Sequence, residues 1–255
     1  IRAAAFTGSV AGGRALFDLA QSRPDPIPFY GELGSLNPTV VTRGALASRA
    51  QEIVTGFVGS YLLGSGQFCT KPGLLFLPEG HGLEAALAEA VAGAAVGPLL
   101  GERIHQAYVH GVATLTEEPD VRAVVPPAPP AGDGYAVAPS LFAVSAAAFV
   151  KRRGPLVEEC FGPTALIVEY ASTDELFAAL DAVPGSLTTT VHADPDAEPE
   201  LVRALLDRAA ARAGRVVWSG WPTGVAVTAA QHHGGPWPAT TAPLHTSVGT
   251  AAMRR

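Results

Sequence analysis

Residues 3–34 read AAAFTGSVAGGRALFDLAQSRPDPIPFYGELG. A short apolar run over 3–7 ends at Gly8, and apolar residues then recur at helical spacing over 13–20. A second apolar run covers 29–34, after a turn broken by prolines. This order is that of a βαβ unit, which takes about 30 residues. The stretch therefore predicts two parallel strands joined by a helix.

The rest of the chain alternates between the same two kinds of segment. We expect strands at 74–77, 165–170, 188–192 and 216–218, and helices at 45–63, 83–95, 173–180 and 198–213, the last closed by Gly214. Strands that alternate with helices are typical of an α/β fold, so we predict a largely parallel open sheet flanked by helices. The proline-rich stretch 126–134 predicts a loop within one domain rather than a linker.

The composition of the 255 residues excludes several classes of protein. With 48% hydrophobic and 16% charged residues, the chain can bury a sizeable core, which argues against disorder. A net charge of −6 argues against a nucleic-acid partner, and no apolar run reaches the ~18 residues that span a bilayer. Two cysteines exclude a disulfide-rich secreted scaffold, so we expect a cytoplasmic location. Because the only Met is Met253, we expect a piece of a longer protein.

Cys69 and Glu32 are the first candidates for chemistry. Cys69 follows the Gly-rich turn 63–68, whose backbone N–H groups could stabilise a thiolate or hold an oxyanion, although a buried core thiol is an equally simple interpretation. Cys160, beside Phe161, is expected to be a packed structural thiol. Glu32 ends a predicted strand, either as a solvated residue or as a partly buried base with a raised pKa. Spacing alone does not place it beside Cys69.

Three further segments carry polar groups with an open interpretation. Gly8-Ser9 could offer N–H groups to a phosphate at a helix N-terminus, but it lacks the dinucleotide-binding fingerprint. Glu158-Glu159 before a sharp turn is either solvated or accepts hydroxyl hydrogen bonds from a sugar. His233 lies in a His-Gly-Gly loop of the kind that lines a pocket or turn. No set of His, Cys or carboxylate residues has convincing metal spacing, so we expect no metal site.

Five motifs between residues 6 and 163, taken in order, resemble the C-terminal portion of the aldehyde dehydrogenase superfamily. They are Phe6-Thr7-Gly8-Ser9, Glu32-Leu33-Gly34 with Asn37-Pro38, Gly66-Gln67-x-Cys69, Gly134-Tyr135 with Pro139 and Phe142, and Glu158-Glu159-x-Phe161-Gly162-Pro163. Residues 214–249 fit more loosely. Residues 67–73, with 233–236 and 246–249, are similar to the branch of ketoglutarate-semialdehyde and NADP-dependent fatty aldehyde dehydrogenases.

The resemblance implies a nucleophile and a base. Cys69 would attack an aldehyde to give a thiohemiacetal, which hydride loss converts to a thioester, and its backbone N–H would supply one oxyanion donor. Glu32 would activate the water that hydrolyses the thioester. Phe68 and His233 would border the substrate pocket. The implied reaction oxidises a semialdehyde or an aliphatic aldehyde to a carboxylic acid.

The resemblance also implies an NADP or NAD site. Glu159 would hold the nicotinamide ribose and Phe161 would pack against that end of the cofactor, while Leu33 would lie at the same site. Gly8 and Ser9 would form the turn near the pyrophosphate. The residues that select NAD or NADP lie upstream in the family, as does the side chain of its second oxyanion donor.

These implications lead to a domain division and to expected partners. Residues 1–36 would be the terminal βαβ remnant of a cofactor domain and 37–255 the catalytic domain. Ser35-Leu36 and Lys71 depart from the general family pattern without touching the Cys–Glu pair. We expect an aldehyde as small-molecule partner, a homo-oligomer (dimer or tetramer) for the intact enzyme, and little or no turnover from this chain alone. The alternatives are a non-catalytic protein, or a thioesterase-like enzyme, that retains the fold.

Overall fold

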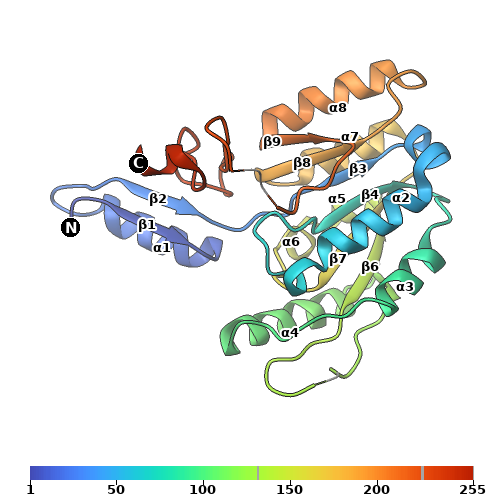
Figure 1. Cartoon of the computed structure of the whole chain (residues 1–255), viewed down its shortest axis with the longest axis horizontal. Helices are drawn as coiled ribbons and strands as arrows, with labels where there is room; N and C mark the ends of the chain where they lie inside the picture. Colours follow the sequence, from blue (N-terminus) through green and yellow to red (C-terminus); the bar gives the residue numbers. More distant parts are fainter. Residues whose placement is uncertain (131, 225–226, 255) are drawn as a thin grey trace.

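A seven-stranded sheet with helices on both faces forms the larger part of the molecule, and a two-stranded sheet stands beside it (Figure 1). The computed structural model describes residues 1–130, 132–224 and 227–254. Ala131, in the predicted proline-rich loop, and Arg255, at the end of the predicted catalytic domain, lie outside the described residues.

The helices and strands follow one another along the whole chain. In chain order they are β1 (Ala4–Thr7), α1 (Val10–Gln21), β2 (Phe29–Glu32), β3 (Thr39–Val41), α2 (Arg43–Tyr61), the 3₁₀ turn η1 (Leu63–Gly66), β4 (Leu74–Pro78), α3 (Glu84–Ala92), α4 (Glu102–Glu117), β5 (Arg122–Val125), β6 (Ser140–Ser145), α5 (Ala146–Lys151), α6 (Arg153–Leu156), β7 (Thr164–Tyr170), α7 (Thr173–Ala182), β8 (Ser186–His192), α8 (Pro199–Arg212), β9 (Ala213–Trp218) and the 3₁₀ helix η2 (Thr250–Arg254).

The large sheet has the strand order β5-β6-β7-β4-β3-β8-β9. Every neighbouring pair is parallel except β5–β6 at one edge. The predicted α/β fold with a largely parallel sheet is therefore confirmed. Because parallel strands all end at the same edge, the loops after β3, β4 and β8 start close together in space.

Two apolar clusters lie on the two faces of this sheet. One packs α4, α5, α6, α7 and α8 against it, and the other packs α2 and α3. Central strand β4 supplies both, with Leu74 and Phe76 facing one cluster and Leu75 and Leu77 the other. A strand buried on both faces reads as a continuous apolar run, which is why 74–77 was predictable.

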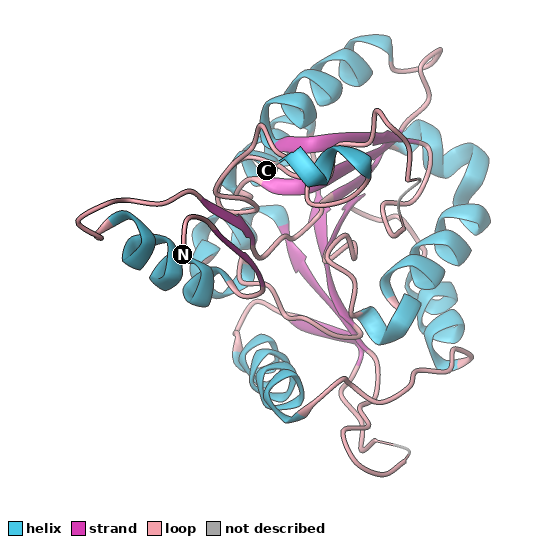
Figure 2. Cartoon of the chain, turned by 60° about the vertical axis from the view of Figure 1, so that its left-hand side comes forward, coloured by secondary structure: helices cyan, strands magenta, loops and turns pink. Residues whose placement is uncertain are grey.

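The small sheet pairs β1 with β2 in parallel, with Thr7 opposite Glu32, so the predicted βαβ unit is confirmed. The C-terminal tail returns to this unit and lies beside β2 in both views (Figures 1 and 2). Backbone hydrogen bonds hold it there, from Leu33 N to Ala239 O (2.8 Å) and from Thr241 N to Gly31 O (3.1 Å). The division into 1–36 and 37–255 stays a prediction.

The predicted end of α8 is wrong. The helix ends at Arg212, and Gly214 lies inside β9 instead of closing the helix. The glycine is required there because the tail passes so near that an added Cβ would lie 1.8 Å from Gly234 O. Strand β3 escaped prediction because its three residues are too short to carry a period.

Within the described part of the chain, no helix has the length and apolar character needed to cross a bilayer.

Phe76 offers a test of the core. Its ring is fully buried on the central strand and meets Phe149 edge-on, with centroids 6.1 Å apart. We expect Phe76→Ala to lower the free energy of unfolding by ~3–5 kcal/mol, because the lost contacts leave a cavity. Urea unfolding measures the change, with Val150→Ala on the exposed side of α5 as control. A loss below ~1 kcal/mol would contradict this packing.

Candidate active site

A tight turn presents Cys69 between α2 and β4. It begins with Gly64, Ser65 and Gly66, all of which have φ between 58° and 68°. At Gly66 a side chain is excluded as well, because a Cβ would lie 2.1 Å from Gly162 O. The turn therefore needs its glycines for conformation and for close approach to the loop before β7.

Asn37 holds the far side of this turn. Its fully buried side chain donates from Nδ2 to Cys69 O (2.8 Å) and to Lys71 O (2.9 Å). Its Oδ1 accepts from Ser35 Oγ (2.7 Å) and from Thr188 N on β8 (3.2 Å). Asn37 itself has a φ of 47°, a left-handed conformation that Asn tolerates better than most residues. One amide thus fixes the position of the Cys69 backbone relative to the sheet.

The side chains of Cys69, His233 and Glu32 are in direct contact. Cys69 Sγ lies 3.3 Å from His233 Nε2, and the same nitrogen lies 3.1 Å from Glu32 Oε1. Glu32 and His233 are both buried, whereas Cys69 is partly exposed. The predicted nucleophile and the predicted base therefore share one histidine nitrogen, a contact that spacing in the sequence did not reveal.

The C-terminal tail brings His233 to Glu32. Glu32 and Thr240 form an antiparallel bridge, and His233 N donates to Thr246 Oγ1 (2.8 Å). Ser247 donates its hydroxyl to Glu32 Oε2. His233, Thr240 and Ser247 line a pocket of about 200 Å³ beside Glu32. Only tertiary structure reveals Ser247, because nothing in its local sequence pairs it with a residue 215 positions away.

The predicted raised pKa of Glu32 is wrong. Burial does raise the pKa of this carboxyl group, but hydrogen bonds from His233 and Ser247 and the charge of His233 outweigh burial and hold the pKa below its usual value. For His233 burial lowers the pKa, yet hydrogen bonds to Cys69 and Glu32 raise it to about 9. At neutral pH the pair is therefore a carboxylate and an imidazolium.

The predicted pyrophosphate turn lies at the start of α1. Ser9 caps this helix, accepting from Gly12 N (3.2 Å), and Gly8 N donates to Glu32 O (3.0 Å). Leu33 is buried, and its side chain packs over Gly13, where a Cβ would lie 2.0 Å away. The turn is thus joined directly to the strand that ends in Glu32.

Glu159 and Phe161 stand on the loop between α6 and β7. Both are partly buried, and Glu159 Oε2 accepts from Ser35 N (3.3 Å). Burial raises the pKa of Glu159 to about 7, although the charge of Lys71 and the bond from Ser35 oppose the rise. The carboxylate lies over Gly34, where an added Cβ would be 2.9 Å from Oε2. Glu159 therefore contacts Gly34 and Ser35 of the β2–β3 connection, which follow Glu32 by two and three positions.

Two other residues singled out from the sequence are Cys160 and Phe68. Cys160 is a free thiol packed against Gly111 and the apolar core, and burial raises its pKa to about 11. Phe68 is 37% exposed, and its ring lies against Gly64. Its assignment to the substrate pocket stays a prediction.

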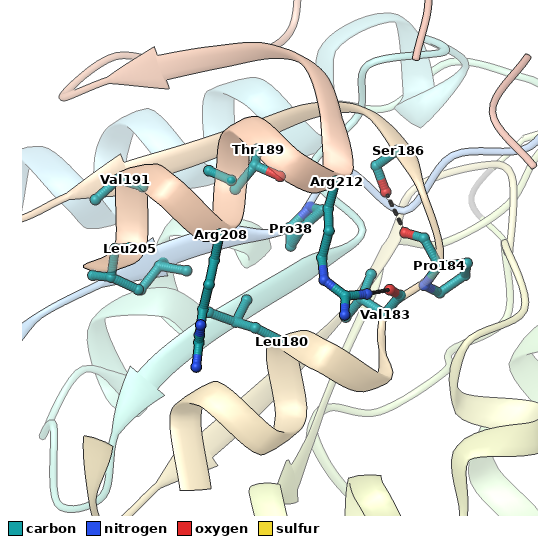
Figure 3. A pocket seen from close by; sticks show the side chains of 12 residues that line it. Pro38, Leu180, Val183, Pro184, Ser186, Thr189, Val191, Leu205, Arg208 and Arg212 are labelled. Atoms are coloured by element: carbon teal, nitrogen blue, oxygen red, sulfur yellow. Dashed lines mark hydrogen bonds between the residues drawn. The ribbon is translucent and has the colours of Figure 1, made fainter. Parts of the chain in front are cut away.

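A larger cavity, of about 360 Å³, lies between α7, α8 and β8 (Figure 3). Its walls are mostly apolar, and Arg212, one of the lining residues, donates to Val183 O (3.2 Å). It contains no carboxylate, thiol or imidazole. The titratable groups line other pockets instead, with Glu32 and His233 at the smaller one and Lys71 and Glu159 at one of about 350 Å³.

Among the residues that the structure describes, two groups of side chains have the geometry to hold a metal ion, contrary to what spacing indicated. One is Glu32, Cys69 and His233 themselves. The other is His81, Glu84 and Glu169, where Arg122 already pairs with both carboxylates. In the first group a metal would occupy the thiol needed as a nucleophile. The absence of a metal stays a prediction.

The contact between His233 and Cys69 should control thiol reactivity. On a Cys160→Ala background, we expect His233→Ala to slow alkylation of Cys69 at neutral pH at least ~10-fold, because the hydrogen bond and the positive charge beside the sulfur are lost. Neighbouring His232→Ala is the matched control and should react like the parent. Equal rates for all three proteins would show that His233 does not act on the thiol.

The same pair should make stability depend on pH. His233 has a raised pKa, so its stabilisation is complete below pH 6.5 and is lost as pH rises through about 9. Glu32 has a lowered pKa, so its stabilisation is complete above pH 4.5 and is lost as pH falls through its folded value. Urea unfolding should therefore show a loss of roughly 1–3 kcal/mol between pH 6.5 and 9 that His233→Asn removes. An unchanged slope in that variant would contradict the pairing.

Comparison with known proteins places this geometry in a family. The profile of the aldehyde dehydrogenase family matches residues 1–236. Alpha-ketoglutaric semialdehyde dehydrogenase 2 of Azospirillum brasilense is 43% identical over 264 residues, which cover 100% of this chain and 49% of that enzyme. Alpha-ketoglutaric semialdehyde dehydrogenase of Acinetobacter baylyi is 37% identical over 258 residues, with the same two shares.

Solved structures share the fold. The NAD+ complex of aldehyde dehydrogenase from Bacillus cereus superposes with a TM-score of 0.78 at 19% identity, covering 99% of this chain and 50% of that one. Bifunctional proline utilization A gives a TM-score of 0.77 at 25% identity, covering 94% and 24%. The chain spans about half the length of the semialdehyde dehydrogenases it matches, and which part of a longer enzyme it represents stays a prediction. By its match over residues 1–236 and its identity to these relatives, the chain belongs to the aldehyde dehydrogenase family.

Proposed function

We propose that this chain carries the reactive groups of an NAD(P)-dependent dehydrogenase that oxidises an aldehyde to a carboxylic acid. The observation that carries the proposal is the shared nitrogen of His233, 3.3 Å from Cys69 Sγ and 3.1 Å from Glu32 Oε1. Covalent catalysis by a thiol uses a nucleophile and a neighbouring group that activates it. Here Cys69 would be the nucleophile, His233 the cation beside it and Glu32 the carboxylate that holds this cation.

Cys69 performs the first step. Its thiolate attacks the carbonyl carbon of the aldehyde and forms a thiohemiacetal, while His233 stabilises the thiolate beforehand. The Cys69 backbone N–H, in the turn that Asn37 holds, is a candidate donor to the resulting oxyanion. A bound nicotinamide cofactor supplies a hydride acceptor, so that the thiohemiacetal carbon is oxidised and Cys69 is left as a thioester.

Glu32 and His233 serve the second step. A water must lose a proton as it attacks the thioester, and the ionised Glu32 carboxylate in the pocket of about 200 Å³ is placed to accept it. Because the contact with His233 holds the pKa of Glu32 low, we expect this contact to loosen as the carboxylate accepts the proton. Hydrolysis releases the carboxylic acid and restores the Cys69 thiol.

The residues near Gly34 fit the nicotinamide end of such a cofactor. Glu159 uses one oxygen for Ser35 N, and a carboxylate has capacity for further donors such as the hydroxyls of a ribose. Gly34 lacks the side chain that would press on this carboxylate. We assign Glu159, Phe161 and Leu33 to that end of NAD or NADP, and Gly8 and Ser9 to the turn near the pyrophosphate.

The substrate and the setting follow from the relatives. Because the two relatives are named for alpha-ketoglutaric semialdehyde, we propose a semialdehyde as substrate, with an aliphatic aldehyde as the next choice. The intact enzyme is proposed to be a homo-oligomer, a dimer or a tetramer. Both cysteines are free, and a catalytic thiol needs a reducing compartment such as the cytoplasm.

Two substitutions in the intact enzyme separate the two steps. Cys69→Ala should abolish aldehyde-dependent formation of reduced nicotinamide, because no thiohemiacetal forms. Glu32→Gln should retain a burst of about one equivalent per active site and then slow at least ~10²-fold, because the thioester is hydrolysed slowly. Rapid-mixing absorbance measures both. Sustained turnover by Cys69→Ala would overturn the proposed function.

A further inference from the structure

Lys71 is buried, and within the described part of the chain its amine forms no ion pair with a carboxylate. Only 3% of the residue is exposed, and its Nζ donates to three backbone carbonyls, Cys160 O at 2.7 Å, Gly162 O at 3.1 Å and Thr164 O at 2.9 Å. Burial lowers the pKa of this amine. An ammonium group has three N–H donors, and here each of them is used by one carbonyl. The role of this group is therefore to form these bonds and not to transfer a proton.

All three carbonyls belong to one segment. Residues 160–164 include Phe161 and immediately follow Glu159, the proposed ribose carboxylate. Apart from Lys71, the described contacts of this segment include a hydrogen bond from Tyr108 Oη to Pro163 O (3.4 Å) and the packing of Gly162 on the Tyr108 ring. Charge-assisted bonds are stronger than neutral ones, so Lys71 is the strongest polar anchor among these contacts.

The other end of Lys71 belongs to the nucleophile turn. Lys71 stands two residues after Cys69, and Asn37 Nδ2 binds the carbonyls of both. The lysine backbone is therefore fixed with Cys69, while its side chain is fixed to the segment beyond Glu159. The charge of Lys71 also favours the ionised form of Glu159, since it opposes the effect of burial on that carboxyl group.

We propose that Lys71 is a positioning residue that ties segment 160–164 to the turn carrying Cys69, and thereby sets the distance between the nucleophile and the cofactor contacts Glu159 and Phe161. The inference rests on the proposed function for the role of Glu159. Its structural part, the tie itself, does not.

The test compares four variants of the intact enzyme. Lys71→Met removes the charge and the three donors at similar length, and Lys71→Gln restores two neutral donors. Cys160→Ala is the matched control, because it changes the same segment but keeps the carbonyl that Lys71 binds. Glu159→Gln reports whether that carboxylate serves the cofactor. Thermal unfolding is measured first, and Lys71→Gln carries the test if Lys71→Met does not fold.

Three readouts are compared in each variant: amide hydrogen exchange at 160–164, the KM for cofactor against kcat, and the alkylation rate of Cys69 without cofactor. We expect Lys71→Met to speed exchange in the segment and raise the cofactor KM at least ~10-fold, while alkylation changes less than about twofold. Lys71→Gln should fall between Lys71→Met and the parent, and Cys160→Ala should match the parent.

The outcomes separate the two proposals. If Glu159→Gln raises the cofactor KM but Lys71→Met leaves both exchange and KM unchanged, the role of Lys71 is overturned and the proposed function stands. If Glu159→Gln leaves KM unchanged, the role of Glu159 fails, and hydrogen exchange alone decides the tie: faster exchange in Lys71→Met supports it and unchanged exchange overturns it. An alkylation rate that falls with KM in Lys71→Met also overturns the proposal, because the damage would then include the nucleophile turn.

Discussion

The side-chain amide of Asn37 joins the parts on which the active site depends. Its Nδ2 donates hydrogen bonds to the carbonyls of Cys69 and Lys71, and its Oδ1 accepts one from Thr188 N on β8. A buried amide can use nearly its full hydrogen-bonding capacity only if every partner is in place. The β2–β3 connection, the nucleophile turn and β8 are therefore positioned together, which fixes the backbone that carries Cys69 opposite the tail that carries His233.

Burial and the contacts between partners act in opposite directions on the charges of Glu32 and His233. Burial alone would neutralise Glu32 and His233, but each is the partner that keeps the other charged, and Ser247 adds to the effect on Glu32. At Glu159 burial outweighs the charge of Lys71 and the hydrogen bond from Ser35, and the pKa rises to about 7. Two carboxyl groups on neighbouring segments thus acquire opposite pKa shifts, so that Glu32 is ionised at neutral pH while Glu159 titrates near it.

Much of the fold was predictable from local pattern. The βαβ unit at the N-terminus and the apolar strand β4 follow from periodicity, and the apolar residues of β4 face the core on both sides of the sheet. The end of α8 was not predictable, because Gly214 is there to admit the C-terminal tail and not to end a helix. The predicted rise in the pKa of Glu32 was wrong in direction, because the partners that lower the pKa lie more than 200 residues away in the chain.

The sequence by itself determined the family, the α/β class and the chemical identity of the groups at the site, because motif order and residue type are local properties. It identified Cys69 and Glu32 separately. Tertiary structure alone decided that His233 contacts both of them and that Ser247 donates to Glu32. It also decided that Lys71 binds the carbonyls of segment 160–164. The physical reason is that charge and hydrogen bonding act over about 3 Å, whereas the residues concerned are 89 to 215 positions apart in the chain.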